Sequence, residues 1–137
     1  MFRLSAVFLM LLALLASPVH AEGEEGAEGA PSVQYIYFEP ALVINFGSKG
    51  RIRYLRTEIA VKVSSAEAAG KVSQHKPSLR NALVFLLSAQ EPKVINSAAG
   101  RESVRGLALE EVRRTMHRLE GMPYIDDLFF NTFVVQN

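Results

Sequence analysis

Cysteine is absent from all 137 residues of this sequence. A chain without cysteine cannot form disulfides, thiolate zinc sites or cysteine nucleophiles, and it offers no thiol for a lipid anchor. The folded part must therefore be held together by packing and by any self-association. An excess of one charge is also lacking, because 15 basic residues face 14 acidic ones. Nucleic-acid-binding proteins usually carry a clustered basic face, so we expect no nucleic-acid partner.

A membrane-spanning length of apolar sequence is missing from the N-terminal region. The apolar run Leu4–Ala16 would rise about 20 Å as a helix, against a hydrocarbon core of about 30 Å. Behind it, Val19 and Ala21 occupy the positions that a signal peptidase reads, and Glu22 follows. We expect residues 1–21 to be a secretory signal peptide cleaved after Ala21. A short uncleaved anchor is the alternative.

Common catalytic motifs are missing too, including the Gly-x-Ser-x-Gly elbow, the phosphate-binding loop and His-Glu-x-x-His. Beyond the leader, only His75 and His117 are present, and they are far apart in the sequence. Asp126 and Asp127 lack the spaced oxygen ligands of a calcium loop. We therefore expect no enzyme activity, no metal and no cofactor.

Residues 22–32 contain glycine, glutamate, alanine, proline and serine but no large apolar side chain. Such a stretch cannot bury enough surface to offset the entropy of ordering it, so we expect a flexible acidic linker. The folded domain is then residues 33–137, enough chain for one domain and too little for two.

Four segments have the composition of strands. The clearest is Leu55–Val63, where apolar residues alternate with charged or small ones, as in a sheet buried on one side. The others are Val33–Phe38, Leu42–Phe46 and Leu128–Gln136. Simple alternation in the last segment puts large apolar residues on both faces, with Phe130 and Val134 on one and Phe129, Phe133 and Val135 on the other. We expect it to lie inside the sheet, with Phe133 and Val135 in the core.

Helical periodicity occupies the region between the third and fourth strands. We expect a short helix or turn at Ala66–Val72, and a helix capped by Ser78 with leucines on one face. Ser97 caps a longer helix that Gly121-Met122-Pro123 ends; its apolar stripe consists of Val104, Ala108, Val112, Met116 and Leu119. The order of elements predicts an α+β domain, with helices packed on one face of a mainly antiparallel sheet.

Several arginines are candidates for contacts with a partner or with a second copy of the chain. Singly, each is also explained as a surface charge. They are Arg53, Arg56, Arg80, Arg101 and Arg105.

Four blocks of the sequence resemble the FliL family of flagellar basal-body-associated proteins. They are Tyr37–Phe46, Arg53–Val61, His75–Gln90 with Gly100–Arg105, and the closing Leu128–Gln136. The blocks follow the order of the family and cover nearly all of the folded domain. Two features depart from the family. A signal-like leader replaces the usual transmembrane helix, and Phe130 stands where threonine is more common.

The resemblance implies a stomatin-like domain that can assemble into rings. It also implies a non-enzymatic accessory of the bacterial flagellar basal body, located in the periplasm at the inner membrane. Its expected partners are the motor stator protein, basal-body components, further copies of itself and the inner-membrane surface. Its expected role is to support motility and chemotaxis. Because the usual anchor is missing, a FliL-like interaction module that serves another envelope complex is the alternative.

Overall fold

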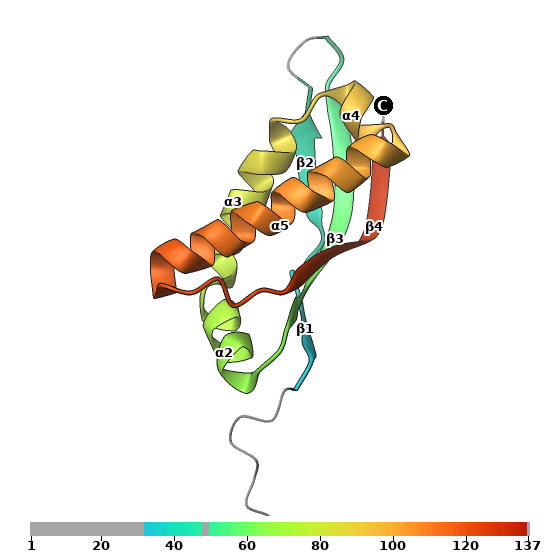
Figure 1. Ribbon diagram of the computed structural model, residues 1–137. Coiled ribbons are helices and arrows are strands. Elements are labelled where there is room, and N and C mark those ends of the chain that lie inside the picture. The colour runs from blue at the N-terminus through green and yellow to red at the C-terminus, as the bar shows by residue number, and fades with distance from the viewer. Residues whose placement is uncertain (1–31, 48–49, 137) are drawn as a thin grey trace, which may run out of the picture.

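The computed structural model describes residues 32–47 and 50–136. The expected signal peptide, its cleavage site and most of the acidic linker lie outside the described residues. Within them the chain folds as an α+β domain in which helices cover one face of a four-stranded antiparallel sheet (Figure 1). The predicted fold class is confirmed. In the described part of the chain, no helix has both the length and the hydropathy needed to cross a membrane.

The sheet is organised around one long strand, β3 (Arg53–Val63). Along one side it pairs with β1 (Gln34–Tyr37) and β2 (Leu42–Phe46), and along the other with β4 (Asp127–Gln136). All three pairings are antiparallel. The alternation predicted for β3 is confirmed, since its helix-facing residues are at most 1% exposed: Leu55, Thr57, Ile59, Val61 and Val63.

Four helices connect β3 to β4: α2 (Ala66–Gln74), α3 (Lys76–Ser88), α4 (Pro92–Ile95) and α5 (Ala98–Glu120). α5 crosses in front of the sheet beside α3 (Figure 1). Ser97 caps α5 as predicted, accepting a hydrogen bond from the Gly100 N–H at 2.9 Å. At the other end, Gly121 has a left-handed φ of 78°, which glycine adopts without a steric penalty.

Two helix predictions were incomplete. α3 begins at Lys76, before the predicted cap Ser78, because Pro77 is tolerated in a first turn, where its missing N–H is not needed. The single turn α4 was not predicted, since four residues give no periodicity.

The core lies between the sheet and the helices. α3 contributes Leu79, Leu83 and Leu87, all fully buried. The predicted stripe of α5 is confirmed at its buried positions Val104, Ala108, Val112 and Met116. Leu119 is the exception, because it is 41% exposed near the end of the helix.

The prediction that the last strand lies inside the sheet was wrong. β4 pairs with β3 alone among the described strands and forms an edge. The face assignment was wrong as well, because Asn131 is an extra residue where the register with β3 shifts. Phe130 and Phe133 therefore share the helix side, with ring centroids 5.1 Å apart. Phe133 and Val135 are half-buried against the core, not fully inside it.

Replacing Phe133 with alanine therefore has a smaller effect than in a fully buried position. We expect Phe133→Ala to lower the free energy of unfolding by about 2 kcal/mol, below the about 3–5 kcal/mol of a buried phenylalanine. Urea denaturation of the purified protein measures this loss. An unchanged midpoint would show that the ring contributes nothing to packing.

Candidate functional site

The structure separates the candidate arginines. Arg53 begins β3 on the helix side, and its Nε is buried without a hydrogen-bond partner among the described residues. Arg56 lies on the opposite, open face of the sheet. It makes a 3.4 Å ion pair with Glu58, and both side chains are about half exposed. Such a solvated pair contributes little to stability, so Arg56 remains accessible to a partner.

The side chain of Arg80 on α3 forms hydrogen bonds within its own domain. Its guanidinium donates to the backbone oxygens of the β1–β2 connection: to Pro40 O at 2.6 Å, to Ala41 O at 3.3 Å and to Phe38 O at 3.5 Å. A planar fork with several donors suits this arrangement of carbonyls. These hydrogen bonds hold α3 against the β1–β2 connection.

Arg101 and Arg105 are brought together. Both line a hollow of about 340 Å³ between the first turns of α5 and β4. From β4 the lining includes Phe129, Phe130 and Phe133. The hollow therefore combines a mostly apolar wall from the strand with two guanidinium groups from the helix.

The two arginines of this hollow differ in their partners. Arg105 bonds to Glu102 at 2.6 Å and to Asp127 at 2.8 Å. The hydrogen bond with Glu102 is the main cause that raises the pKa of Arg105, and it also lowers the pKa of Glu102. Arg101 makes no ion pair within the described residues, and its guanidinium carbon lies 5.7 Å from the ring centroid of Phe133. Arg101 is thus the cation of the hollow that remains without a carboxylate in the described part of the chain.

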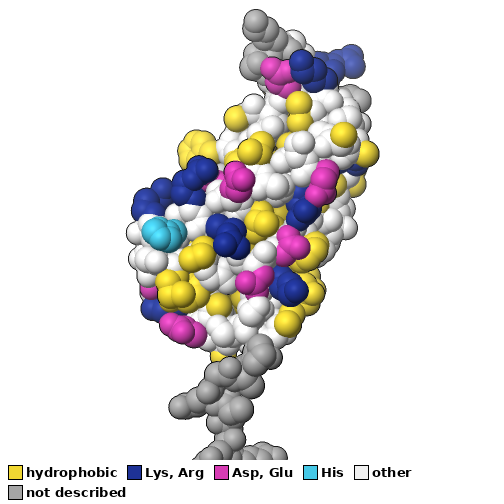
Figure 2. Space-filling model, in the orientation of Figure 1, with side chains coloured by type: hydrophobic (Ala, Val, Ile, Leu, Met, Phe, Trp, Pro, Cys, Tyr) yellow, Lys and Arg dark blue, Asp and Glu magenta, His cyan; other side chains and the backbone are white. Residues whose placement is uncertain are grey.

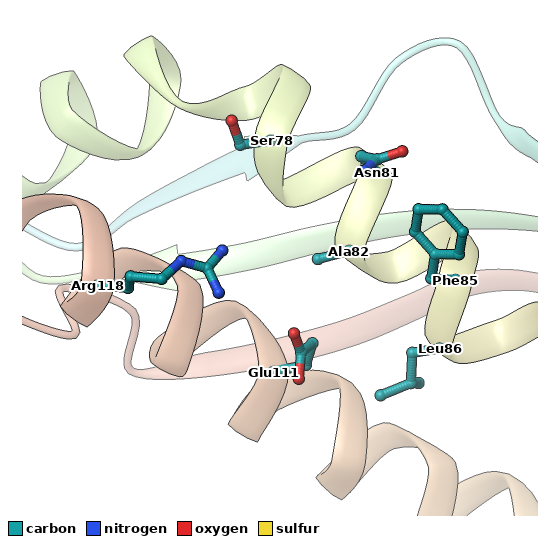
Figure 3. A pocket seen from close by; sticks show the side chains of 7 residues that line it. All are labelled: Ser78, Asn81, Ala82, Phe85, Leu86, Glu111 and Arg118. Carbon is teal, nitrogen blue, oxygen red and sulfur yellow. The ribbon is translucent and has the colours of Figure 1, made fainter.

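A second hollow lies between α3 and α5 (Figure 3). It has a volume of about 580 Å³ and is lined by Ser78, Asn81, Ala82, Phe85, Leu86, Glu111 and Arg118. Phe85 is 67% exposed at its border. Glu111 is paired with Arg114 at 2.8 Å. This open groove can receive an apolar side chain, but the lining brings together no nucleophile and base.

The surface over the helices carries charges of both signs. Figure 2 shows lysine and arginine intermixed with aspartate and glutamate and with apolar patches on this face. The opposite face of the sheet exposes aromatic side chains, with Tyr35 and Tyr37 both about half exposed. Tyr35 lies 6.1 Å from Phe129 between ring centroids. Exposed apolar side chains gathered on a surface are a feature of contact surfaces.

An ionic cluster joins the ends of three helices. The His75 Nε2 donates to Glu120 Oε1 at 2.6 Å, and Lys71 Nζ lies 3.1 Å from Glu120 Oε2. The hydrogen bond with His75, followed by that with Lys71, lowers the pKa of Glu120 below its ordinary value of 4.5. Glu120 in turn raises the pKa of Lys71 above 10.5. These contacts stabilise the packing of the α2–α3 junction against the C-terminal end of α5.

This cluster predicts a pH dependence of stability. Because the pKa of Glu120 is lowered in the folded state, its contribution is complete above pH 4.5 and is lost as the pH falls through the lowered value. We expect Glu120→Gln to destabilise the protein near neutral pH, with the difference from the unchanged protein shrinking towards about pH 3. Urea titrations at both pH values test this. A difference that is independent of pH would contradict the ionic role.

The aromatic hollow beside β4 was missed from the sequence. Arg101 and Arg105 were named as candidates, but the three phenylalanines were assigned to both faces of an interior strand. Phe130 and Phe133 share the helix side only because of the extra residue Asn131, which strict alternation cannot reveal. The only available signal was the polar Asn131-Thr132 pair within an otherwise apolar run.

Comparison with known proteins identifies one family. The family model described as "Flagellar basal body-associated protein FliL" matches residues 35–136. A curated relative, the "Flagellar protein FliL" of Aquifex aeolicus (strain VF5), is 23% identical over 107 residues, which cover 77% of this chain and 64% of the relative. The chain thus spans less than two thirds of that relative's length. The match includes all four strands and all four helices described above except the first residue of β1.

Proposed function

Because this chain belongs to the FliL family, we propose that it acts as a non-enzymatic accessory of the bacterial flagellar basal body and supports flagellum-dependent motility by associating with the motor stator. The observation that carries the proposal is the family match over nearly the whole described domain. The geometry supports it, because the hollows found here are open, mixed apolar and charged surfaces that suit protein contacts.

We propose a periplasmic location, at the inner membrane and the flagellar base, reached through the signal peptide of residues 1–21. The apolar run Leu4–Ala16 and the cleavage residues Val19, Ala21 and Glu22 support this proposal. Mass spectrometry of the protein released from the periplasm should find Glu22 as the first residue. An intact Met1 in the membrane fraction would favour the uncleaved anchor.

Self-association is a further part of the proposal. The stomatin-like assembly expected for the family would place copies side by side in a ring, with Arg53 and Arg56 as candidate contacts. If residues 1–21 are cleaved as proposed, no anchor concentrates the copies, and association should be weak. Light scattering over a concentration series should show the mass rising. A constant monomer mass at the highest soluble concentration would contradict a self-assembled ring.

The alternative function is a periplasmic interaction module for another envelope complex. The short leader favours it, because the thirteen-residue run Leu4–Ala16 is below the about twenty residues that a membrane-spanning helix needs. In-frame deletion of the gene separates the two functions. We expect slower swimming and reduced spreading in soft agar, restored by the gene on a plasmid. Normal motility together with an envelope defect would favour the alternative.

A further inference from the structure

The free side of β4 is the exposed edge of this sheet. β4 pairs with β3 on one side, and none of the other described strands pairs with its second side. Figure 1 shows β4 along the border of the sheet with α5 crossing beside it. The N–H and C=O groups on such an edge are a template for another strand unless the protein blocks them.

The protein blocks only the beginning of this edge. The N–H of Leu128 donates to Asp127 Oδ1 at 2.8 Å, and its C=O accepts from Arg105 at 3.1 Å. The extra residue Asn131 then interrupts the regular pairing. Beyond it, in Thr132–Gln136, no backbone group bonds to any described residue outside β3. The second half of β4 is therefore the open part of the edge.

The aromatic hollow adjoins this open half. Phe130 and Phe133 form its wall on the strand, and Ala98, Arg101 and Glu102 approach from α5. A strand edge with a neighbouring helix is the geometry in which extended peptides bind by strand addition. The backbone provides affinity, and pockets for alternate side chains provide specificity. The hollow is placed to receive one apolar side chain of such a peptide.

Charge indicates what kind of segment fits. Arg105 is already neutralised by Glu102 and Asp127, whereas Arg101 has no carboxylate within the described residues. A carboxylate on the bound segment would give Arg101 the ion-pair partner that it lacks among the described residues. A second copy fits poorly, because antiparallel pairing of two β4 strands about their middle would bring the two Arg101 side chains towards each other. Like charges placed together across an interface oppose association.

We propose that Thr132–Gln136 and the adjoining hollow bind an extended segment of a partner protein as an added strand. An apolar side chain of the segment packs against Phe130 and Phe133, and a carboxylate pairs with Arg101. This surface and mode of recognition would serve the proposed function. Only the flagellar identity of the partner rests on that function.

Selection from a phage-displayed library of random dodecapeptides, on the immobilised protein, tests the inference. We expect enriched peptides with alternating apolar residues and an acidic residue. Selection on Arg101→Glu should enrich basic residues instead. The matched control is Arg118→Glu, which reverses a charge on the same helix in the α3–α5 groove and should leave the preference unchanged. Thermal unfolding of both variants confirms that they are folded.

One enriched acidic peptide is then measured directly. By fluorescence anisotropy, Arg101→Glu should weaken its binding about tenfold, which corresponds to the loss of about 1.4 kcal/mol. N-methylation of alternate peptide amides should abolish binding, and amide exchange of the bound protein should slow in Thr132–Gln136. Enrichment of the same peptides on Arg101→Glu, loss of binding in Arg118→Glu, or no enrichment at all would each overturn the inference.

The proposed function fails in a different experiment. If deletion of the gene leaves swimming unchanged, the flagellar role is wrong, whereas the peptide preference of the purified protein is unaffected. If the peptide preference is missing but deletion impairs swimming, only the strand-addition surface is wrong.

Discussion

We expect replacement of Gly100 with alanine to lower the free energy of unfolding by about 3 kcal/mol, the upper range for forcing an extra carbon into a packed site. A Cβ at this position would overlap the backbone oxygen of Val94 and lie 2.6 Å from Ser97 Oγ. Both neighbours are fixed, since Ser97 caps α5 and its hydroxyl also donates to Val94 O at 3.3 Å. Denaturant titration of the purified variant measures the loss.

Gly106 provides the matched control for Gly100 on the same helix. No atom lies within 4 Å of a Cβ added there. Gly106→Ala should therefore raise stability by about 0.5–1 kcal/mol, because alanine is the better helix former. Opposite signs for the two substitutions are the expected result. Stabilisation by both would show that α4 does not approach Gly100 closely.

Replacement of Arg80 with methionine has the second large effect, an expected loss of about 3 kcal/mol, near the upper range for hydrogen bonds from a charged donor. Methionine keeps much of the apolar stem but leaves the carbonyls of Pro40 and Ala41 without their donor. Arg80→Lys should recover part of the loss, since one ammonium group cannot reach all the carbonyls as the planar fork does. The melting temperature of each variant tests this.

Arg114 is the control for Arg80, because it is an exposed arginine whose only ion pair is with Glu111 among the described residues. Arg114→Met should change stability by less than about 1 kcal/mol. If Arg80→Met melted normally and only lost binding to a partner, Arg80 would be a contact residue and not a structural one.

Local patterns predicted most of the fold. The alternation in β3 and the apolar stripe of α5 could be predicted because each depends on the periodicity of one regular element. The position of β4 in the sheet could not be predicted in this way. Its large side chains on both faces suggested an interior strand, but the extra residue Asn131 puts Phe130 and Phe133 on the same side, where they meet α5, while Phe129 stays beside Tyr35.

The roles of the candidate contact residues could not be distinguished from the sequence either. In the sequence, Arg80 and Arg101 were equivalent candidates, each a single charge. The structure gives Arg80 three backbone acceptors and leaves Arg101 over Phe133 at the border of a hollow. This difference depends on a connection and a strand that are distant in the sequence. It could not be obtained from local composition.

The most direct test of the proposed role is where the protein accumulates in living cells. The full chain, fused at its C-terminus to a fluorescent protein that folds in the periplasm, should form foci that coincide with labelled flagellar bases. These foci should disperse when the stator genes are deleted and return when they are restored. Uniform envelope fluorescence in motile cells that the fusion complements, or foci away from flagella, would contradict a basal-body accessory that associates with the stator.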